Sequence, residues 1–320
     1  MASTIVKTAT NYAGSVAEYM YEVLQDGADF LEAGKAAAYQ QVGTRYKRQL
    51  DKLAYDADPI EDYTDGAPAF ASGATKSPRD IEPRKMTISG KFLPSEWLND
   101  WAPYAPNGDL TQLKMNPAFL QRVFDLGMNS AWTQIADLFW VGDLLAGGGS
   151  PLRFFDGIIT KLIADSDTDV VFLLPAGNIT TANVFDVIKA AYDAMTPYQL
   201  KDKDFHMAVS YNTWKILKEA NTDAKSTTVG FLDVEDNTYY QGKKITPYVG
   251  FPDNYLLATR MGGMETSNLV FDVYFSLDSE FSTIDVFKVT NGGKEYGYRI
   301  DYMADAQYQY GGDAILYEPV

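Results

Sequence analysis

The sequence predicts an α+β protein of elongated shape, and three patterns indicate it. Near the C-terminus, EYGYRIDYMADAQYQYGG places Tyr or another apolar residue at the even-numbered positions, as in a strand of unusual length. Residues 116–140 repeat apolar side chains at three- and four-residue steps, which is typical of one long helix. Between these two segments, strand-like and helix-like pieces alternate, which indicates a compact α/β unit.

The composition is that of a folded protein with a strongly acidic surface. Of the 320 residues, 46% are apolar and 22% are charged, and a chain of this length can bury a large core. The 27 basic and 43 acidic side chains leave a formal net charge of −16, which repels nucleic-acid phosphates. We therefore do not expect sequence-specific binding to DNA or RNA.

Two further features of the sequence bear on where the chain is made. It contains no Cys, which excludes disulfides and thiolate metal sites and fits a reducing cytosol. The N-terminal segment lacks the basic and apolar layout of a secretory signal, and no apolar run approaches the ~18 residues of a membrane span. We expect synthesis in a cytoplasm and no membrane contact.

The first third of the chain is predicted to contain an arm, a long exposed excursion of the chain and a strand. Residues 1–33 mix Gly, Ser and Thr with a short amphipathic helical pattern, as in an arm that docks elsewhere. Residues 56–80 are rich in Asp, Pro, Gly, Ser and Ala without an apolar period, so we expect a long exposed excursion there. Residues 83–93 (PRKMTISGKFL) alternate apolar and polar side chains and predict a strand.

The long helix has clear start and stop signals. Asn116 is suited to the N-cap and Pro117 to the first helical position. Continued to Trp140, the helix would be about 36 Å long at ~1.5 Å per residue. The glycines 147–149 and the following Pro151 end this region.

The remaining elements are short until the end of the chain. Strands are expected at VVFLLP, FHMAVS, KKITPYVG, NYLLATR and SNLVFDVYFSL, and helices at TANVFDVIKAAYDAM and YNTWKILKEA. Asn291-Gly292 predicts a tight hairpin turn after TIDVFKV, because both residues tolerate positive φ. The run 296–310 that follows would span about 50 Å as one extended strand.

No catalytic or metal-binding signature is complete. His206 is the only histidine and has no partner motif, so we interpret it as a packed or hydrated strand residue. Asp165, Asp167 and Asp169 begin like a calcium loop, but the positions for the turn Gly and the bidentate Glu are not filled, so we expect a solvated loop. The glycines 147–149 lack the Lys and the hydroxyl of a phosphate-binding loop.

Two features leave functional alternatives open. Any two of the 43 carboxylates could form a glycosidase pair, which sequence spacing cannot measure. The tyrosine stripe near the C-terminus could stack against sugars, although the inner or partner-facing side of a sheet is the favoured interpretation. Its members are Tyr296, Tyr298, Tyr302, Tyr308 and Tyr310.

The order of these parts resembles the major capsid proteins of tailed phages with the Hong Kong 97 fold. The local phrases FFDGIITKL, VGFPDNYLLATR, TSNLVFDVYFSLDSEF and DAILYEP also resemble that family. The resemblance implies an N-terminal arm (1–43), an extended-loop region (44–93), a peripheral domain with a spine helix (94–165), an axial domain (166–265), and peripheral return strands with a closing axial-domain strand (266–320).

The resemblance implies a late structural protein without catalytic activity, cofactor or metal. Its copies would assemble as hexamers and pentamers in the host cytoplasm into an icosahedral virion capsid around double-stranded DNA, without sequence-specific contact. Scaffold, portal and decoration proteins are the expected partners, the scaffold being a separate protein or absent. An alternative with the same fold is an encapsulin-type shell around cargo enzymes. An alternative from another class is an aromatic-rich carbohydrate-binding or hydrolytic protein.

The resemblance also places subunit contacts on the extended loop. Lys76 is expected at the loop tip and is a candidate for a covalent crosslink, although an unmodified exposed lysine is favoured. Deleting Asp62 to Asp80 is expected to weaken assembly while the core stays folded. The intersubunit contact candidates are Tyr63, Pro68, Phe70, Lys76 and Arg79.

Overall fold

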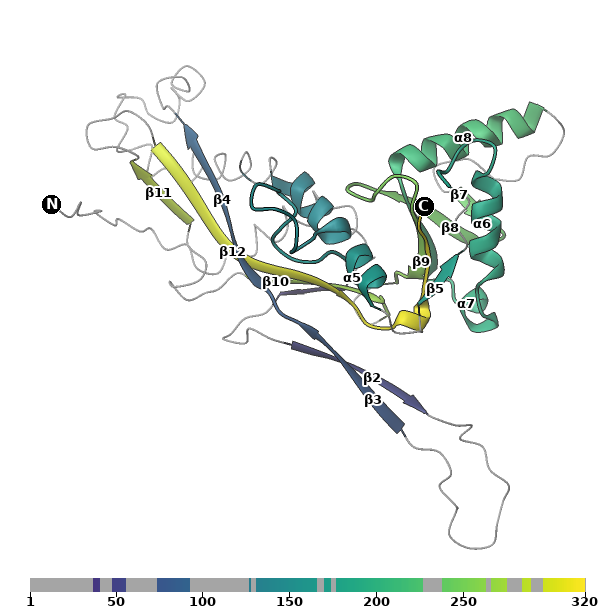
Figure 1. The fold of residues 1–320 in the computed structure, drawn as a ribbon, viewed down its shortest axis with the longest axis horizontal. Coiled ribbons are helices and arrows are strands. Elements are labelled where there is room, and N and C mark those ends of the chain that lie inside the picture. Colours follow the sequence, from purple (N-terminus) through teal and green to yellow (C-terminus); the bar gives the residue numbers. More distant parts are fainter. Residues whose placement is uncertain are drawn as a thin grey trace, which may run out of the picture.

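Two sheets and a separate hairpin organise the chain (Figure 1). The computed structural model describes residues 37–40, 48–55, 74–92, 127, 131–165, 170–173, 177–226, 238–262, 266–274, 284–288 and 296–319. Within these residues, one sheet has five strands, the other has six, and the hairpin has two.

The five-stranded sheet is built around one long strand, β12 (Tyr296–Tyr308), of 13 residues. β4 (Arg84–Phe92) runs antiparallel along one edge of β12. β11 (Ile284–Lys288) and β10 (Leu269–Tyr274) follow each other along the other edge. This follows because β12 residues 296–300, which pair with β11, and 303–304, which pair with β10, also pair with β4. β1 (Ala37–Gln40) adds a parallel strand outside β10. The predicted long strand is confirmed.

The six-stranded sheet belongs to the α/β unit expected in the centre of the chain. Its strands, in spatial order, are β5 (Val171–Leu173), β13 (Ala314–Tyr317), β9 (Leu256–Arg260), β6 (Phe205–Ser210), β8 (Lys243–Tyr248) and β7 (Thr238–Tyr240). The pairs β6–β8 and β5–β13 are parallel, and the others are antiparallel. α6 (Val184–Asp193) and α8 (Tyr211–Ser226) pack their apolar sides against this sheet in one buried cluster.

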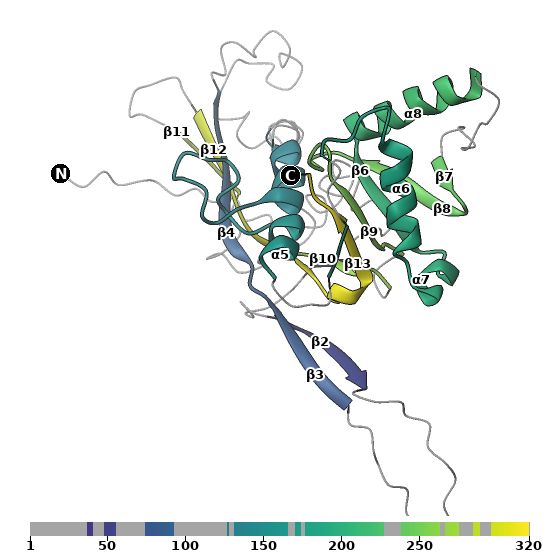
Figure 2. The ribbon, with the colours of Figure 1, turned by 45° about the vertical axis from the view of Figure 1, so that its right-hand side comes forward.

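The helical segment 131–141 lies between the two sheets (Figures 1 and 2). The ring of Phe139 is 5.6 Å from that of Phe271 on β10. The next residue, Trp140, is 5.5 Å from Tyr248 on β8 and 4.9 Å from Phe251. Because successive helical residues point about 100° apart, two neighbours reach different sheets. One continuous core therefore joins both sheets through this helix and α5 (Ile158–Ala164).

The predicted face of this helix is confirmed where it is described. Ile135, Leu138 and Phe139 are all buried, as the three- and four-residue spacing indicated. Ala136 and Trp140 are also buried, because the helix has a sheet on two sides. The expected start at Asn116 and Pro117 and the turn at Asn291-Gly292 lie outside the described residues. The antiparallel pairing of β11 with β12 agrees with a hairpin there.

The last part of the excursion predicted at residues 56–80 is a strand that the residue pattern did not indicate. Residues 74–80 belong to β3 (Ala74–Ile81), which pairs antiparallel with β2 (Arg48–Tyr55). The two strands project away from both sheets in both views (Figures 1 and 2). A ribbon without a core behind it needs no apolar alternation, so the sequence lacks the pattern by which strands are usually recognised.

Among the short elements that were not anticipated are β1, α5, β7 and α7 (Pro197–Lys201). A usable signal existed for α7, because Thr196 and Gln199 form a capping box around Pro197 at the start of the helix. Among the described helices, none is long and apolar enough to cross a membrane.

Candidate assembly site: the projecting hairpin and its joints

The hairpin connects directly to the five-stranded sheet, because β3 continues into β4 with only Glu82 and Pro83 between them. Pro83 has no backbone N–H, so the strand cannot continue its hydrogen-bond ladder there. The Glu82 N–H instead donates to Asp305 Oδ2 at 2.9 Å, and Gln307 Nε2 donates to the carbonyl of Asp80 at 3.0 Å. Side chains of β12 thus take over where the backbone pairing of β4 ends.

Asp305 is the centre of a buried ionic contact at this base. Lys161 Nζ lies 2.9 Å from Asp305 Oδ1 and also donates to the carbonyl of Ala306. Asp305 Oδ1 further accepts the Ala306 N–H at 2.8 Å. Burial raises the pKa of Asp305, while Lys161 and the backbone donors act in the opposite direction. The contact ties α5 to β12 and, through Glu82, to the base of the hairpin.

A second contact at the base joins three elements. The guanidinium of Arg79 on β3 donates to Asp165, the residue that caps the C-terminus of α5. The Tyr308 hydroxyl on β12 donates to the same Asp165 oxygen. The Arg79 guanidinium also lies over the Tyr308 ring, 4.2 Å from its centroid. The expectation that Asp165 lies in an ordinary solvated loop is therefore wrong, while Asp167 and Asp169 lie outside the described residues.

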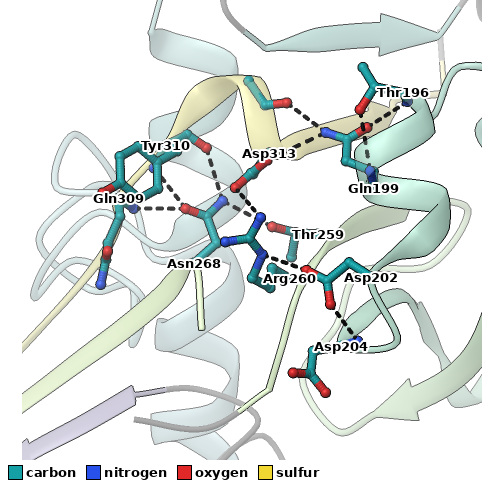
Figure 3. Close-up of polar contacts among 11 residues, drawn as sticks. Thr196, Gln199, Asp202, Asp204, Thr259, Arg260, Asn268, Gln309, Tyr310 and Asp313 are labelled. Atoms are coloured by element: carbon teal, nitrogen blue, oxygen red, sulfur yellow. Dashed lines mark hydrogen bonds and ion pairs between the residues drawn. The ribbon is translucent and has the colours of Figure 1, made fainter. Parts of the chain in front are cut away.

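Asn268 joins the two chain segments that pass between the sheets (Figure 3). Its Nδ2 donates to Thr259 Oγ1 and to the Tyr310 carbonyl, both at 2.9 Å. Its Oδ1 accepts the N–H groups of Gln309 at 3.2 Å and of Tyr310 at 2.7 Å. The β9–β10 and β12–β13 connections are thereby held side by side. Because Asn268 is only 2% exposed, water cannot replace these bonds easily.

An ionic cluster continues from this joint towards α7 (Figure 3). Arg260 at the end of β9 lies 2.9 Å from Asp202 Oδ2 and 3.4 Å from Asp313 Oδ2. Gln199 Nε2 donates to the Gly312 carbonyl at 2.8 Å. The turn that carries the chain from β12 into β13, a 3-10 helix at Gly311–Asp313, is thus anchored to the α/β unit.

The tyrosine stripe forms core rather than a ligand surface. Tyr302 and Tyr308 are buried, and Tyr298 packs against the same cluster, with its ring over Gly90 of β4. Tyr310 is half-buried at the Asn268 joint, and the side chain of Tyr296 is outside the described part. This burial confirms the interpretation of an inner sheet face and removes the observation that suggested a sugar-stacking platform.

The described residues contain little that points to catalysis. His206 is half-buried on β6, with Nε2 3.1 Å from the Lys203 carbonyl, and burial lowers its pKa. No group of three or more His, Cys, Asp or Glu side chains within this part of the chain could hold a metal ion.

The exposed apolar side chains are spread over several elements. Leu145, in the loop after the 131–141 helix, is 94% exposed, and Tyr198 on α7 is 86% exposed. Large exposed apolar side chains often mark contacts with other molecules when they gather on a surface. Further examples occur on α5, β5, α8 and β7: Ile163, Val171, Phe172, Tyr211 and Tyr239.

The predicted contact residues fall on and beyond the hairpin. Lys76 is not at the loop tip but within β3, opposite Leu53 of β2. Arg79 is at the hairpin base, where its side chain contacts Asp165 and Tyr308 of the same chain. Tyr63, Pro68 and Phe70 lie outside the described residues, so their role stays a prediction.

The sequence matches no known family model and no curated protein, whereas the fold is similar to several solved capsid structures. A chain of the satellite phage P4 procapsid is 12% identical with a TM-score of 0.58, over 98% of this chain and 93% of that one. This chain has the fold of phage capsid proteins. A chain of the capsid of an empty GTA particle has a similar fold. It is 10% identical, with a TM-score of 0.56, over 89% of this chain and 88% of that one. A cyanophage A-1(L) capsid chain is similar at 11% identity and a TM-score of 0.53, over 89% and 91% of the two chains.

Proposed function

We propose that this chain is the major capsid protein of a tailed phage, a structural protein that forms the virion shell. Copies would assemble in the host cytoplasm as hexamers and pentamers and close into an icosahedral shell around double-stranded DNA. The observation that carries the proposal is the similarity to a phage procapsid chain over nearly the whole length of both chains.

The shape of the molecule supports the same conclusion. The long strands around β12 make one extended flank, the α/β unit lies at its side, and the hairpin reaches outwards (Figure 1). The large exposed apolar side chains of the described residues lie on several elements, as expected of a subunit that contacts several neighbours. The net charge of −16 suits a wall that does not hold DNA tightly.

We assign the Hong Kong 97 parts to the structure as follows. The helix that includes residues 131–141 would be the spine helix, and the sheet around β12 the peripheral domain. The six-stranded sheet with α6 and α8 would be the axial domain, which meets its copies at the ring centre. The β2–β3 hairpin would be the extended loop, lying against a neighbouring copy through the segment that contains Tyr63, Pro68, Phe70 and Lys76.

Negative-stain imaging of the purified chain tests the proposal, with nuclease treatment of particles isolated from producing cells. Rings or closed shells, and nuclease-protected double-stranded DNA in those particles, are the expected results. Shells that enclose proteins without DNA would instead indicate the encapsulin-type alternative. A chain that stays a monomer at all concentrations would contradict both.

The role of the hairpin can be tested without disturbing its strands. Deleting Asp62 to Asp80 would remove most of β3, so we replace residues 56–73 with Asn-Gly, which can join Tyr55 to its cross-strand partner Ala74. The variant should keep the melting temperature of the parent chain and lose closed shells. Normal shells from this variant would contradict a bridging role for residues 56–73.

A further inference from the structure

The hairpin is attached to the body through a small apolar contact at its base. Leu50 of β2, Ile81 of β3 and Val270 of β10 form a separate buried cluster, and Ile81 is completely buried. These three side chains hold the ends of the two strands against the five-stranded sheet. The bonds of Glu82 to Asp305 and of Asp80 to Gln307 lie beside this cluster. Because all these contacts are at the end of β3, they hold that end in place but leave the angle of the hairpin weakly defined.

Arg79 supplies a further attachment two residues outwards from Ile81 along β3. Its guanidinium bonds to Asp165 and makes a cation–π contact with the Tyr308 ring, 4.2 Å from the ring centroid. Because Tyr308 also bonds to Asp165, the three side chains form a closed triangle. The Arg79 and Asp165 side chains are 21% and 22% exposed, and Tyr308 is buried, so the triangle is largely shielded from water.

The chemistry of Asp165 indicates that it serves this contact rather than its own helix. A carboxylate at the C-terminus of a helix is unfavourable, because the last carbonyl groups already carry partial negative charge. Asp165 stands at that position on α5, where Arg79 supplies the compensating positive charge. Burial and the hydrogen bond to Asp165 raise the pKa of Tyr308, as expected for a protonated hydroxyl that donates to a carboxylate.

Small changes of angle at this base have large effects further out. The eight residues of β3 span about 26 Å at ~3.3 Å per residue, so a tilt of about 15° moves the far end by about 7 Å. Protein interfaces pack as tightly as protein interiors, so a displacement of this size prevents a matched contact.

We propose that Arg79, Asp165 and Tyr308 act as a strut that sets the angle of the β2–β3 hairpin, which makes Arg79 a positioning residue for the contact between the hairpin and a second copy of this chain. The apolar cluster is the pivot, and the triangle fixes the direction of the strands. The assembly part of this inference rests on the proposed function, whereas the strut itself does not.

A distance measurement by pulsed electron spin resonance tests the strut. Because the chain has no Cys, spin labels can be placed at Lys76→Cys on β3 and Lys189→Cys on the exposed side of α6 without other changes. Dilution of the labelled chain with unlabelled chain restricts the signal to distances within one subunit, in shells or in solution. We expect one narrow distance distribution for the parent protein.

Substitutions in the triangle should broaden this distribution in a graded way. Arg79→Ala should broaden and shift it by up to about 4 Å, because Lys76 lies about 16 Å from Ile81 at ~3.3 Å per residue and a tilt of about 15° moves it by that amount. Arg79→Lys should have an intermediate effect, because a lysine can pair with Asp165 but has no planar guanidinium to stack on the Tyr308 ring. Arg299→Ala is the matched control, since it removes an Arg–Asp pair within β12, 2.8 Å from Asp301, that does not reach the hairpin.

The outcomes separate the strut from the proposed function. A broadened distribution together with fewer closed shells in Arg79→Ala supports the inference. An unchanged distribution overturns the strut, and a broadened one with normal shells overturns its role in assembly. If the parent chain forms no shells, the proposed function fails, while the distances still decide whether the strut exists. If Arg79→Ala does not fold, the distance distribution and shell formation of Arg79→Lys decide between the same outcomes.

Discussion

Replacing Lys161 with Met should destabilise the protein through the carboxyl group that it leaves behind. The Lys161 and Asp305 side chains are 19% and 8% exposed, and the charged atoms are 2.9 Å apart. At an effective dielectric constant of about 20, their gross attraction is about 6 kcal/mol, most of it offset by the loss of hydration. Removing one partner of such a pair typically costs about 3–5 kcal/mol, because the other charge stays buried.

The loss should depend on pH in a direction that identifies its cause. Burial raises the pKa of Asp305 above its ordinary value of 3.8, and Lys161 opposes this shift. Without Lys161 the pKa rises further, so folded Asp305 holds a proton more tightly than the unfolded chain does. A group with a raised folded pKa contributes most at low pH and loses that contribution as pH rises through the raised value. The deficit of Lys161→Met should therefore be larger at about pH 7.5 than at about pH 5.

Urea unfolding followed by circular dichroism at both pH values measures this prediction. The double variant Lys161→Met with Asp305→Asn should recover part of the stability, because no buried charge remains. Lys215→Met is the control, since Lys215 is exposed and 3.9 Å from Glu219, and it should change stability by no more than about 0.5 kcal/mol. A deficit that is under about 1 kcal/mol, or equal at both pH values, would refute the reasoning.

Three further predictions concern the joints of the body. Ile135→Lys places a charge on the buried helix face and should lower the free energy of unfolding in urea by several kcal/mol. Thr133→Lys on the exposed side should be nearly neutral. Equal melting temperatures of these two variants would mean that the helix is rotated. Gly250→Ala should lower the melting temperature more than Gly242→Ala, because both have positive φ but only Gly250 would place its Cβ 2.5 Å from the backbone of the 131–141 helix. Asn268→Asp should cost about 2–4 kcal/mol at neutral pH, since a carboxylate would face the carbonyl and hydroxyl that the amide nitrogen now binds; an unchanged unfolding midpoint would argue against the Asn268 joint.

Much of the layered architecture could be predicted from local patterns. The alternation in residues 296–308 reflects the even-numbered side chains that β12 places in the main core, although Met303 and Asp305 on its other face are buried too. The spacing of Ile135, Leu138 and Phe139 reflects a helix packed on a sheet. Both patterns arise because burial of apolar surface is the largest favourable term in folding and repeats with the geometry of the backbone. The hairpin strand β3 was missed for the same reason, since a projecting ribbon has no core to impose a pattern.

The joints were decided only by the tertiary structure. Asp165 looks like a residue of an acidic loop in the sequence, and its partners Arg79 and Tyr308 lie 86 and 143 residues away. The sequence by itself determined the elements that bury one side in the core, because local spacing records which side of such a strand or helix is buried. The polar contacts at the ends of those elements depend on how distant segments pack together. A single hydrogen bond produces no repeating pattern in the sequence from which it could be predicted.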